Sequence, residues 1–108
     1  MLPDRFRLRS SAEFAQVIRH GKKAARPSLV MYASRGEPKL GLVVGKSVGG
    51  AVVRNRVKRR IRHLVAPLLV PGCAMSVVVR ALPKAGQSGN SLSRDLYSAW
   101  SACEKDLR

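Results

Sequence analysis

A basic, amphipathic segment at residues 50–66 constrains the fold of this chain more than any other feature. Six of the nine residues from Arg54 to Arg62 are Arg or Lys, and no acidic residue lies among them. The apolar residues of the segment recur at the spacing of one helical stripe, namely Val53, Val57, Ile61 and Leu64. We therefore expect a helix that packs this stripe on a core and presents its cations outward.

The density of positive charge indicates a polyanionic partner. The chain carries 21 Lys and Arg against six Asp and Glu, a formal net charge of +15, and no acidic residue lies between Glu37 and Asp95. Like charges one helical turn apart destabilise a helix by a few tenths of a kcal/mol, and solvated faces usually alternate in sign. Such an imbalance is typical of proteins that bind nucleic acid or an anionic membrane. A solvated basic face without a partner is the weaker alternative.

The sequence argues against a membrane protein and against a self-sufficient enzyme. No apolar run approaches the roughly 18 residues of a spanning helix, and no signal peptide opens the chain, so we expect a cytoplasmic protein. Cys73 and Cys103 lack metal-ligand spacing; we expect two buried thiols, with a disulfide as the alternative. Paired carboxylates and a Ser/His/Asp set are missing, whereas a protein nuclease acting alone normally needs carboxylates.

The rest of the chain predicts one small α+β domain over residues 1–108, with helices on a mostly antiparallel sheet. Ser10 and Glu13 form a capping-box pattern that opens the first helix, and Gly21 can end it. Strands at 28–34 and 39–46 should pair as a hairpin. Before them a short strand at 22–26 is weakly indicated, and after the basic helix we expect a strand at 75–82 and a helix from about residue 90. Pro67 either ends or bends the basic helix.

The segment KSVGGAVVRNRVKRRIR, residues 46–62, closely resembles the Arg-Asn-Arg signature of the protein subunit of bacterial ribonuclease P. The resemblance also takes in residues 5–8, 13–14 and 20–21, and covers nearly the whole chain. It implies a small αβββαβα sandwich like ribosomal S5 domain 2, with a left-handed βαβ crossover. The general rule alone predicts a right-handed crossover.

In that family a catalytic RNA with bound Mg²⁺ hydrolyses the phosphodiester bond at the 5′ end of precursor tRNA. The protein binds this RNA and holds the single-stranded 5′ leader. The resemblance therefore implies the non-catalytic subunit of an endoribonuclease, with Mg²⁺ bound mainly by RNA, and with no membrane or small-molecule partner. A structural RNA-binding protein of the ribosome is the alternative, and a protein nuclease acting alone is a third.

The resemblance assigns RNA contacts to two sets of residues. The basic helix contributes Arg54, Asn55, Arg56, Lys58, Arg59, Arg60 and Arg62. A leader cleft is formed by Phe14, Ile18, Val30, Tyr32, Val43, Lys46 and Arg80. Stacking of a base on Tyr32 would contribute about 1–3 kcal/mol. The carbonyl of Asn55 can approach a hydrated Mg²⁺ or make a structural hydrogen bond, and both roles stay open.

Three positions depart from the family pattern. Ile18 replaces a second aromatic residue that is common there, which keeps the apolar wall but weakens stacking. Ser47 stands where a second Lys is frequent, so one phosphate contact is in doubt. Gly50 stands where Asn is common, which costs a helix N-cap only a few tenths of a kcal/mol.

Overall fold

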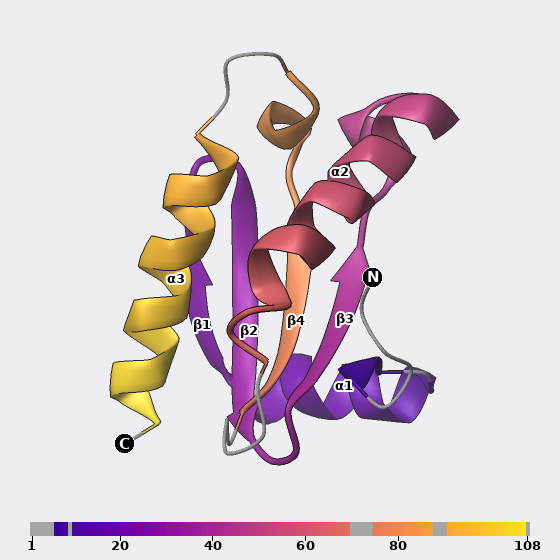
Figure 1. The fold of residues 1–108 in the computed structure, drawn as a ribbon. Coiled ribbons are helices and arrows are strands. Elements are labelled where there is room, and N and C mark those ends of the chain that lie inside the picture. The colour runs from indigo at the N-terminus through magenta and orange to yellow at the C-terminus, as the bar shows by residue number, and fades with distance from the viewer. Residues whose placement is uncertain (1–5, 9, 70–74, 88–90, 108) are drawn as a thin grey trace.

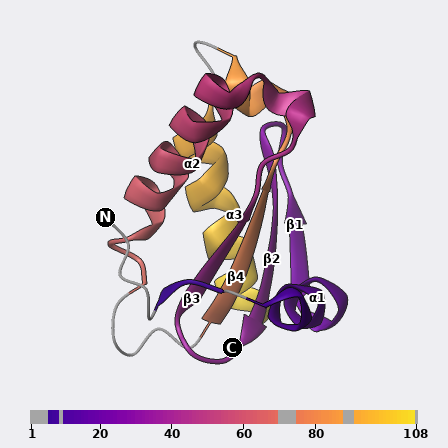
Figure 2. The same ribbon diagram turned by 90° about the vertical axis from the view of Figure 1, so that its right-hand side faces the viewer.

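The computed structural model describes residues 6–8, 10–69, 75–87 and 91–107. These residues form three α-helices and one four-stranded sheet with the order β1-β2-β4-β3. The elements in chain order are α1 (Ser11–His20), β1 (Lys22–Ala25), β2 (Leu29–Arg35), β3 (Lys39–Val43), η2 (Lys46–Val48), α2 (Ala51–Val65), β4 (Met75–Ala81), η3 (Pro83–Gly86) and α3 (Leu92–Asp106). Helices α2 and α3 cover one face of the sheet, and α1 packs on the other (Figure 1, Figure 2). The predicted α+β class is confirmed.

The predicted hairpin between β2 and β3 is wrong, because β4 lies between them. β4 pairs antiparallel with β2 and parallel with β3. Its consecutive residues Val77, Val78 and Val79 are all fully buried, so it is apolar on both faces. A strand of this kind is stable only in the interior of a sheet whose two faces are covered. The turn residues at 35–38 do reverse the chain, but they do not bring β2 and β3 together.

The connection from β3 through α2 to β4 is a left-handed crossover. With the strands upright and α2 toward the viewer, the chain steps from β3 leftward to β4 (Figure 1). About 98% of such connections are right-handed, so this chain is an exception to the general rule. The handedness implied by the family resemblance is confirmed, and so is a mostly antiparallel sheet, because β1 pairs antiparallel with β2 as well.

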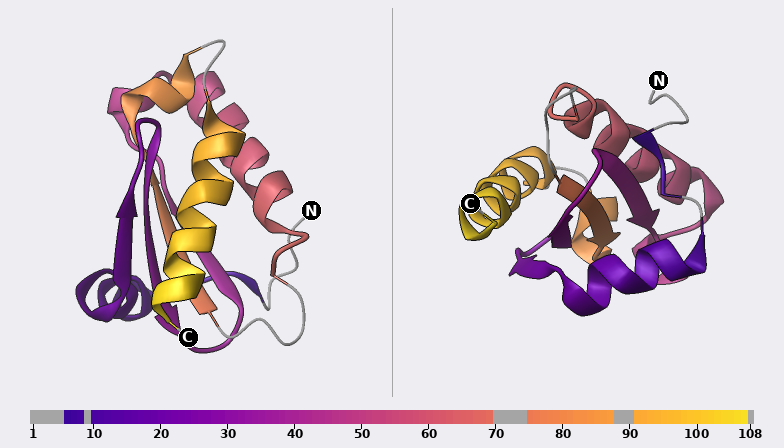
Figure 3. Two further views of the ribbon diagram at one scale, coloured as in Figure 1. Left: turned by 90° about the vertical axis from the view of Figure 1, so that its left-hand side faces the viewer. Right: turned by 90° about the horizontal axis from the view of Figure 1, so that it is seen from below.

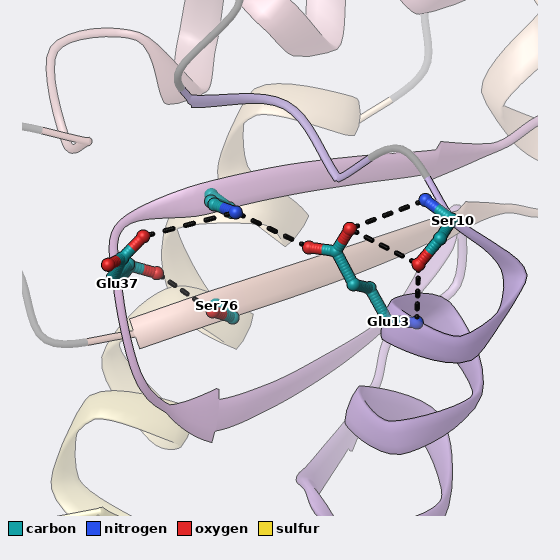
Figure 4. A network of polar contacts seen from close by, with 5 residues as sticks. Ser10, Glu13, Glu37 and Ser76 are labelled. Carbon is teal, nitrogen blue, oxygen red and sulfur yellow. Dashed lines mark hydrogen bonds and ion pairs between the residues drawn. The ribbon is translucent and has the colours of Figure 1, made fainter.

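Helix α1 begins with the predicted capping box (Figure 4). The Glu13 amide donates to Ser10 Oγ at 3.1 Å, and the Ser10 amide donates to Glu13 Oε1 at 3.4 Å. Lys39 Nζ lies 3.4 Å from Glu13 Oε2 and 3.9 Å from Glu37 Oε2. Ser76 Oγ donates to the backbone oxygen of Glu37 at 2.8 Å. These contacts join the first turn of α1 to the starts of β3 and β4.

The main core lies between the sheet and the helices α2 and α3 (Figure 3). Its largest fully buried side chains include Leu29, Met31, Ile61, Leu92 and Leu96. Cys103 is buried there as expected, and burial raises the pKa of its thiol. Cys73 lies outside the described residues.

A second, smaller cluster lies on the α1 face. Leu8, Val17 and Val78 are buried in it, and Phe14 and Tyr32 pack against them. The ring of Phe14 rests on the backbone of Gly41. A Cβ at Gly41 would come within 2.5 Å of Phe14 Cε1 and 3.1 Å of Leu8 Cδ1. The missing side chain at position 41 therefore makes room for the first helix.

One carboxylate is buried where α3 meets the start of β2. Asp95 is only 7% exposed and accepts hydrogen bonds from Ser28 Oγ at 2.6 Å, the Ser28 amide at 3.1 Å and Ser91 Oγ at 3.1 Å. Burial by itself raises the pKa of Asp95, but the hydrogen bonds from Ser28 and Ser91 outweigh it. The pKa therefore lies below its usual value. The ionised form of Asp95 stabilises the junction.

We expect Asp95→Asn to lower the free energy of unfolding by about 1–3 kcal/mol at neutral pH, because all three hydrogen bonds converge on Oδ2 and a neutral amide oxygen accepts them more weakly than a carboxylate oxygen. The folded state depresses the pKa of Asp95. The contribution of Asp95 to the free energy of unfolding is therefore fully present above its unfolded-state pKa of about 3.9, and it is lost as the pH falls through its folded-state pKa. Urea denaturation across the acid range measures this difference. Asp106→Asn, an exposed site on the same helix, is the matched control. If the loss of stability caused by Asp95→Asn stays constant into strong acid, the ionised state assigned to Asp95 is contradicted.

We expect Gly41→Ala to destabilise the protein by about 1–3 kcal/mol, the usual cost of overpacking a filled site, because the new methyl group displaces Phe14. The free energy of unfolding in urea measures the effect. Gly45→Ala is the matched control in the same region, since nothing lies within 4 Å of a Cβ there. If Gly41→Ala and Gly45→Ala destabilise the protein equally, the packing of Phe14 does not depend on the missing side chain at position 41.

Candidate nucleic-acid interface

Helix α2 turns its cations away from the core. Val57 and Ile61 of the predicted stripe are buried, Val53 and Leu64 are half-buried, and Val65, which the prediction did not include, is buried as well. Each full burial contributes about 1.5–3 kcal/mol. This exceeds the few tenths of a kcal/mol lost to each pair of like charges on the helix. Asn55, Arg56, Arg59 and Arg60 are exposed, whereas Arg54, Lys58 and Arg62 are half-buried along the edge of the apolar stripe. The helix ends at Val65, so Pro67 follows its end and does not bend it.

A groove of about 460 Å³ lies between α2 and the N-terminal segment. The residues that line it are Arg7, Asn55, Lys58, Arg59, Arg62, His63 and Ala66. Four of the seven residues predicted for the basic helix thus line one groove, and Arg54, Arg56 and Arg60 do not. The groove is lined mainly by cations, which suits a ligand with several phosphates.

Arg7 is a groove residue that the sequence did not single out. Its segment lies beside β3, where Arg7 and Leu40 form a parallel bridge and the Leu8 amide donates to the Leu40 oxygen at 3.0 Å. The resemblance of residues 5–8 to the family was the signal in the sequence that pointed to this segment. Their position next to α2 depends on this long-range pairing, which the sequence does not show.

The second predicted surface lies on the opposite face of the sheet, beside α1. The strand register places Val30 of β2, Arg80 of β4 and Val43 of β3 in one row. Tyr32 lies in the next row, paired with Val78, whose partner on β3 is Gly41. The structure therefore brings the predicted strand residues of the cleft onto one face.

Helix α1 supplies the wall of this surface. Phe14 covers Gly41, and Ile18 follows one helical turn later with 42% of its surface exposed. Val43 is 38% exposed and Arg80 is exposed, while Val30 and Tyr32 are half-buried. Lys46 is exposed at the start of η2, just beyond β3. We call the surface formed by these seven residues the leader cleft, after the role that the family resemblance predicts for it. It combines apolar side chains with two cations.

Helices α2 and α1 lie on opposite faces of the sheet (Figure 2), so the basic helix and the leader cleft beside α1 are on opposite faces as well. They meet at one corner, where β3 leads through η2 into α2. A molecule bound along α2 and a second one bound in the cleft can therefore be held at the same time without overlap.

None of the described helices is both long and apolar enough to cross a membrane. Within the described residues, no group of three or more His, Cys, Asp or Glu residues is arranged to hold a metal ion.

Comparison with known proteins identifies the family. The family model described as Ribonuclease P matches residues 2–104. The chain is 50% identical over 91 residues to the Ribonuclease P protein component of Acidothermus cellulolyticus, covering 79% of this chain and 76% of that one. It is 46% identical to the same component of Streptomyces griseus, with 92% of each chain covered.

Solved structures agree in fold. A Staphylococcus aureus RNase P protein mutant with defective mRNA degradation activity matches with a TM-score of 0.80 at 23% identity, covering 93% of this chain and 89% of that one. The RNase P protein from Thermotoga maritima matches with a TM-score of 0.60 at 24% identity, covering 92% and 89%. With the family model spanning almost its full length, the chain belongs to the family of bacterial ribonuclease P protein components.

Proposed function

We propose that this chain is the non-catalytic protein subunit of an endoribonuclease, and that a catalytic RNA removes the 5′ leader of precursor tRNA with its help. The observation that carries the proposal is the pair of surfaces on opposite faces of one sheet, one densely basic and one partly apolar. Two RNA molecules of different character need two such surfaces. A structural protein of the ribosome is not favoured, because the family match is to ribonuclease P.

In this proposal the basic helix holds the catalytic RNA. The exposed Arg56, Arg59 and Arg60 neutralise phosphates, and the groove beside Arg7 accepts the backbone. Arg54 is half-buried at the edge of the apolar stripe, where its guanidinium group can contact a phosphate. Binding through such contacts releases counterions, so its affinity falls steeply with salt.

The leader cleft holds the single-stranded leader. Single strands bind to apolar and aromatic surfaces that take the bases and to cations that take the phosphates. Ile18, Val43 and Tyr32 offer the first kind of contact, and Arg80 and Lys46 offer the second. Because Phe14 is packed on Gly41, it shapes the wall of the cleft, and the half-buried Tyr32 offers an aromatic ring on which a base can stack.

Mg²⁺ belongs to the RNA in this account. Mg²⁺ prefers carboxylate and phosphate oxygens, whereas Asn55 offers one neutral oxygen in a groove that also contains Lys58, Arg59 and Arg62. The protein residues alone do not fit a magnesium site, so we assign the ion to the RNA subunit and substrate. The proposal also places the protein in the cytoplasm, where precursor tRNA is processed in bacteria.

The test is reconstitution of the purified protein with a bacterial ribonuclease P RNA and a 5′-extended precursor tRNA at low Mg²⁺. We expect cleavage at the mature 5′ end to require the RNA and to be strongly raised by the protein. Tyr32→Ala should weaken binding of the leader-bearing substrate about 5- to 150-fold, the equivalent of one lost stacking contact, without weakening binding of mature tRNA. Tyr97→Ala is the control, since Tyr97 is 44% exposed on α3, across the sheet.

The outcomes separate the alternatives. Cleavage that the protein does not change would contradict the subunit role. If the Tyr32→Ala and Tyr97→Ala proteins raise cleavage equally, the proposed role of the leader cleft is contradicted, but the subunit role is not. Cleavage by the protein without any RNA subunit would support a protein nuclease instead. Urea denaturation of each variant shows that it is folded under the assay conditions.

A further inference from the structure

The face of the sheet that carries the leader cleft continues beyond β2 to the edge strand β1. The register pairs Lys23 with Tyr32 and Ala25 with Val30. Directly paired residues share a face of an antiparallel sheet, so Lys23 lies on the cleft face. Its neighbour Lys22 pairs with Ala33, a buried core residue, and therefore lies on the other face.

The floor of this surface is open across all four strands. The row formed by Ala25, Val30, Arg80 and Val43 is exposed at three of its positions, and Val30 is half-buried. Three gaps between neighbouring strands make the row about 14 Å wide. Such a width takes more than one nucleotide.

Helix α1 runs alongside this row. Its first turns lie over β3, where Phe14 covers Gly41, and its end lies near β2, where a Cβ at Gly21 would come within 2.6 Å of the Ala33 oxygen. Figure 3 shows the helix crossing the strands on this side of the sheet. A single strand laid along α1 therefore passes from the β3 edge to the β1 edge.

The charge at the β1 edge suits a phosphate. No acidic residue occurs between Glu13 and Glu37. The end of α1 and the cleft face of β1 carry three exposed basic residues, namely Arg19, His20 and Lys23. Among these, Lys23 shares the row of Tyr32, so its ammonium group can reach the backbone of a nucleotide stacked on that ring.

We propose that the leader track extends across the sheet to β1, where Lys23 binds a leader phosphate beyond those held by Arg80 and Lys46. The inference rests on the proposed function of the cleft. The β3 edge adjoins η2 and α2, which hold the catalytic RNA in that proposal. The β1 edge thus receives the part of the leader farther from the cleavage site, and Lys23 is a positioning residue for long leaders.

The test compares Lys23→Ala with Lys22→Ala in the reconstituted ribonucleoprotein. The two residues are adjacent, exposed and equally charged, and they differ in the face of the sheet on which they lie. The dissociation constant is measured for precursor tRNAs whose leaders are lengthened one nucleotide at a time. Lys23→Ala should weaken binding several-fold for long leaders only. It should also lower the salt slope by about 0.7, the value for one phosphate on a single strand.

Lys22→Ala should leave both quantities unchanged, and Lys23→Arg should restore them. Equal losses for the two alanine variants would show an effect of net charge alone and would overturn the inference. So would a Lys23→Ala protein that matches the wild type at every leader length. If the wild-type affinity does not depend on the leader at all, the proposed function itself fails and the inference falls with it.

Discussion

The central position of β4 is the constraint on which the rest of the structure depends. Val77 and Val79 pack into the core beneath α2 and α3, while Val78 packs into the cluster beneath α1. Because both faces of β4 are apolar, both faces of the sheet must be covered. The chain meets this requirement with α2 and α3 on one side and α1 on the other. The basic helix and the leader cleft are consequently placed back to back.

The positive charge of the chain destabilises the folded state, and it also makes the folded protein suitable for binding a polyanion. A net charge of +15 on one small domain destabilises the compact state by self-repulsion. The buried stripe of Val57, Ile61 and Val65 holds α2 in place despite its cations. An RNA that binds only the folded protein stabilises it further by mass action. In the proposed function, folding and RNA binding are therefore coupled through α2.

The sequence predicts local features of this fold well and long-range pairing poorly. The capping box, the apolar stripe of α2 and the alternation of β2 depend on near neighbours, and the structure has all three. The hairpin prediction failed because the two-sided burial of β4 decides which strands touch. Arg7 was missed because a parallel bridge to Leu40 sets its position. Lys23 was not singled out because a lysine on a short edge strand is usually protection against strand pairing.

The most direct test of the two-surface account is the affinity of the protein for the catalytic RNA in the absence of substrate. Arg59→Ala and Arg80→Ala remove the same charge from exposed positions on opposite faces of the sheet. The account predicts weaker binding and a smaller salt dependence for Arg59→Ala, and unchanged binding for Arg80→Ala. Equal losses for the two variants would contradict a division of the two RNA contacts between the two faces.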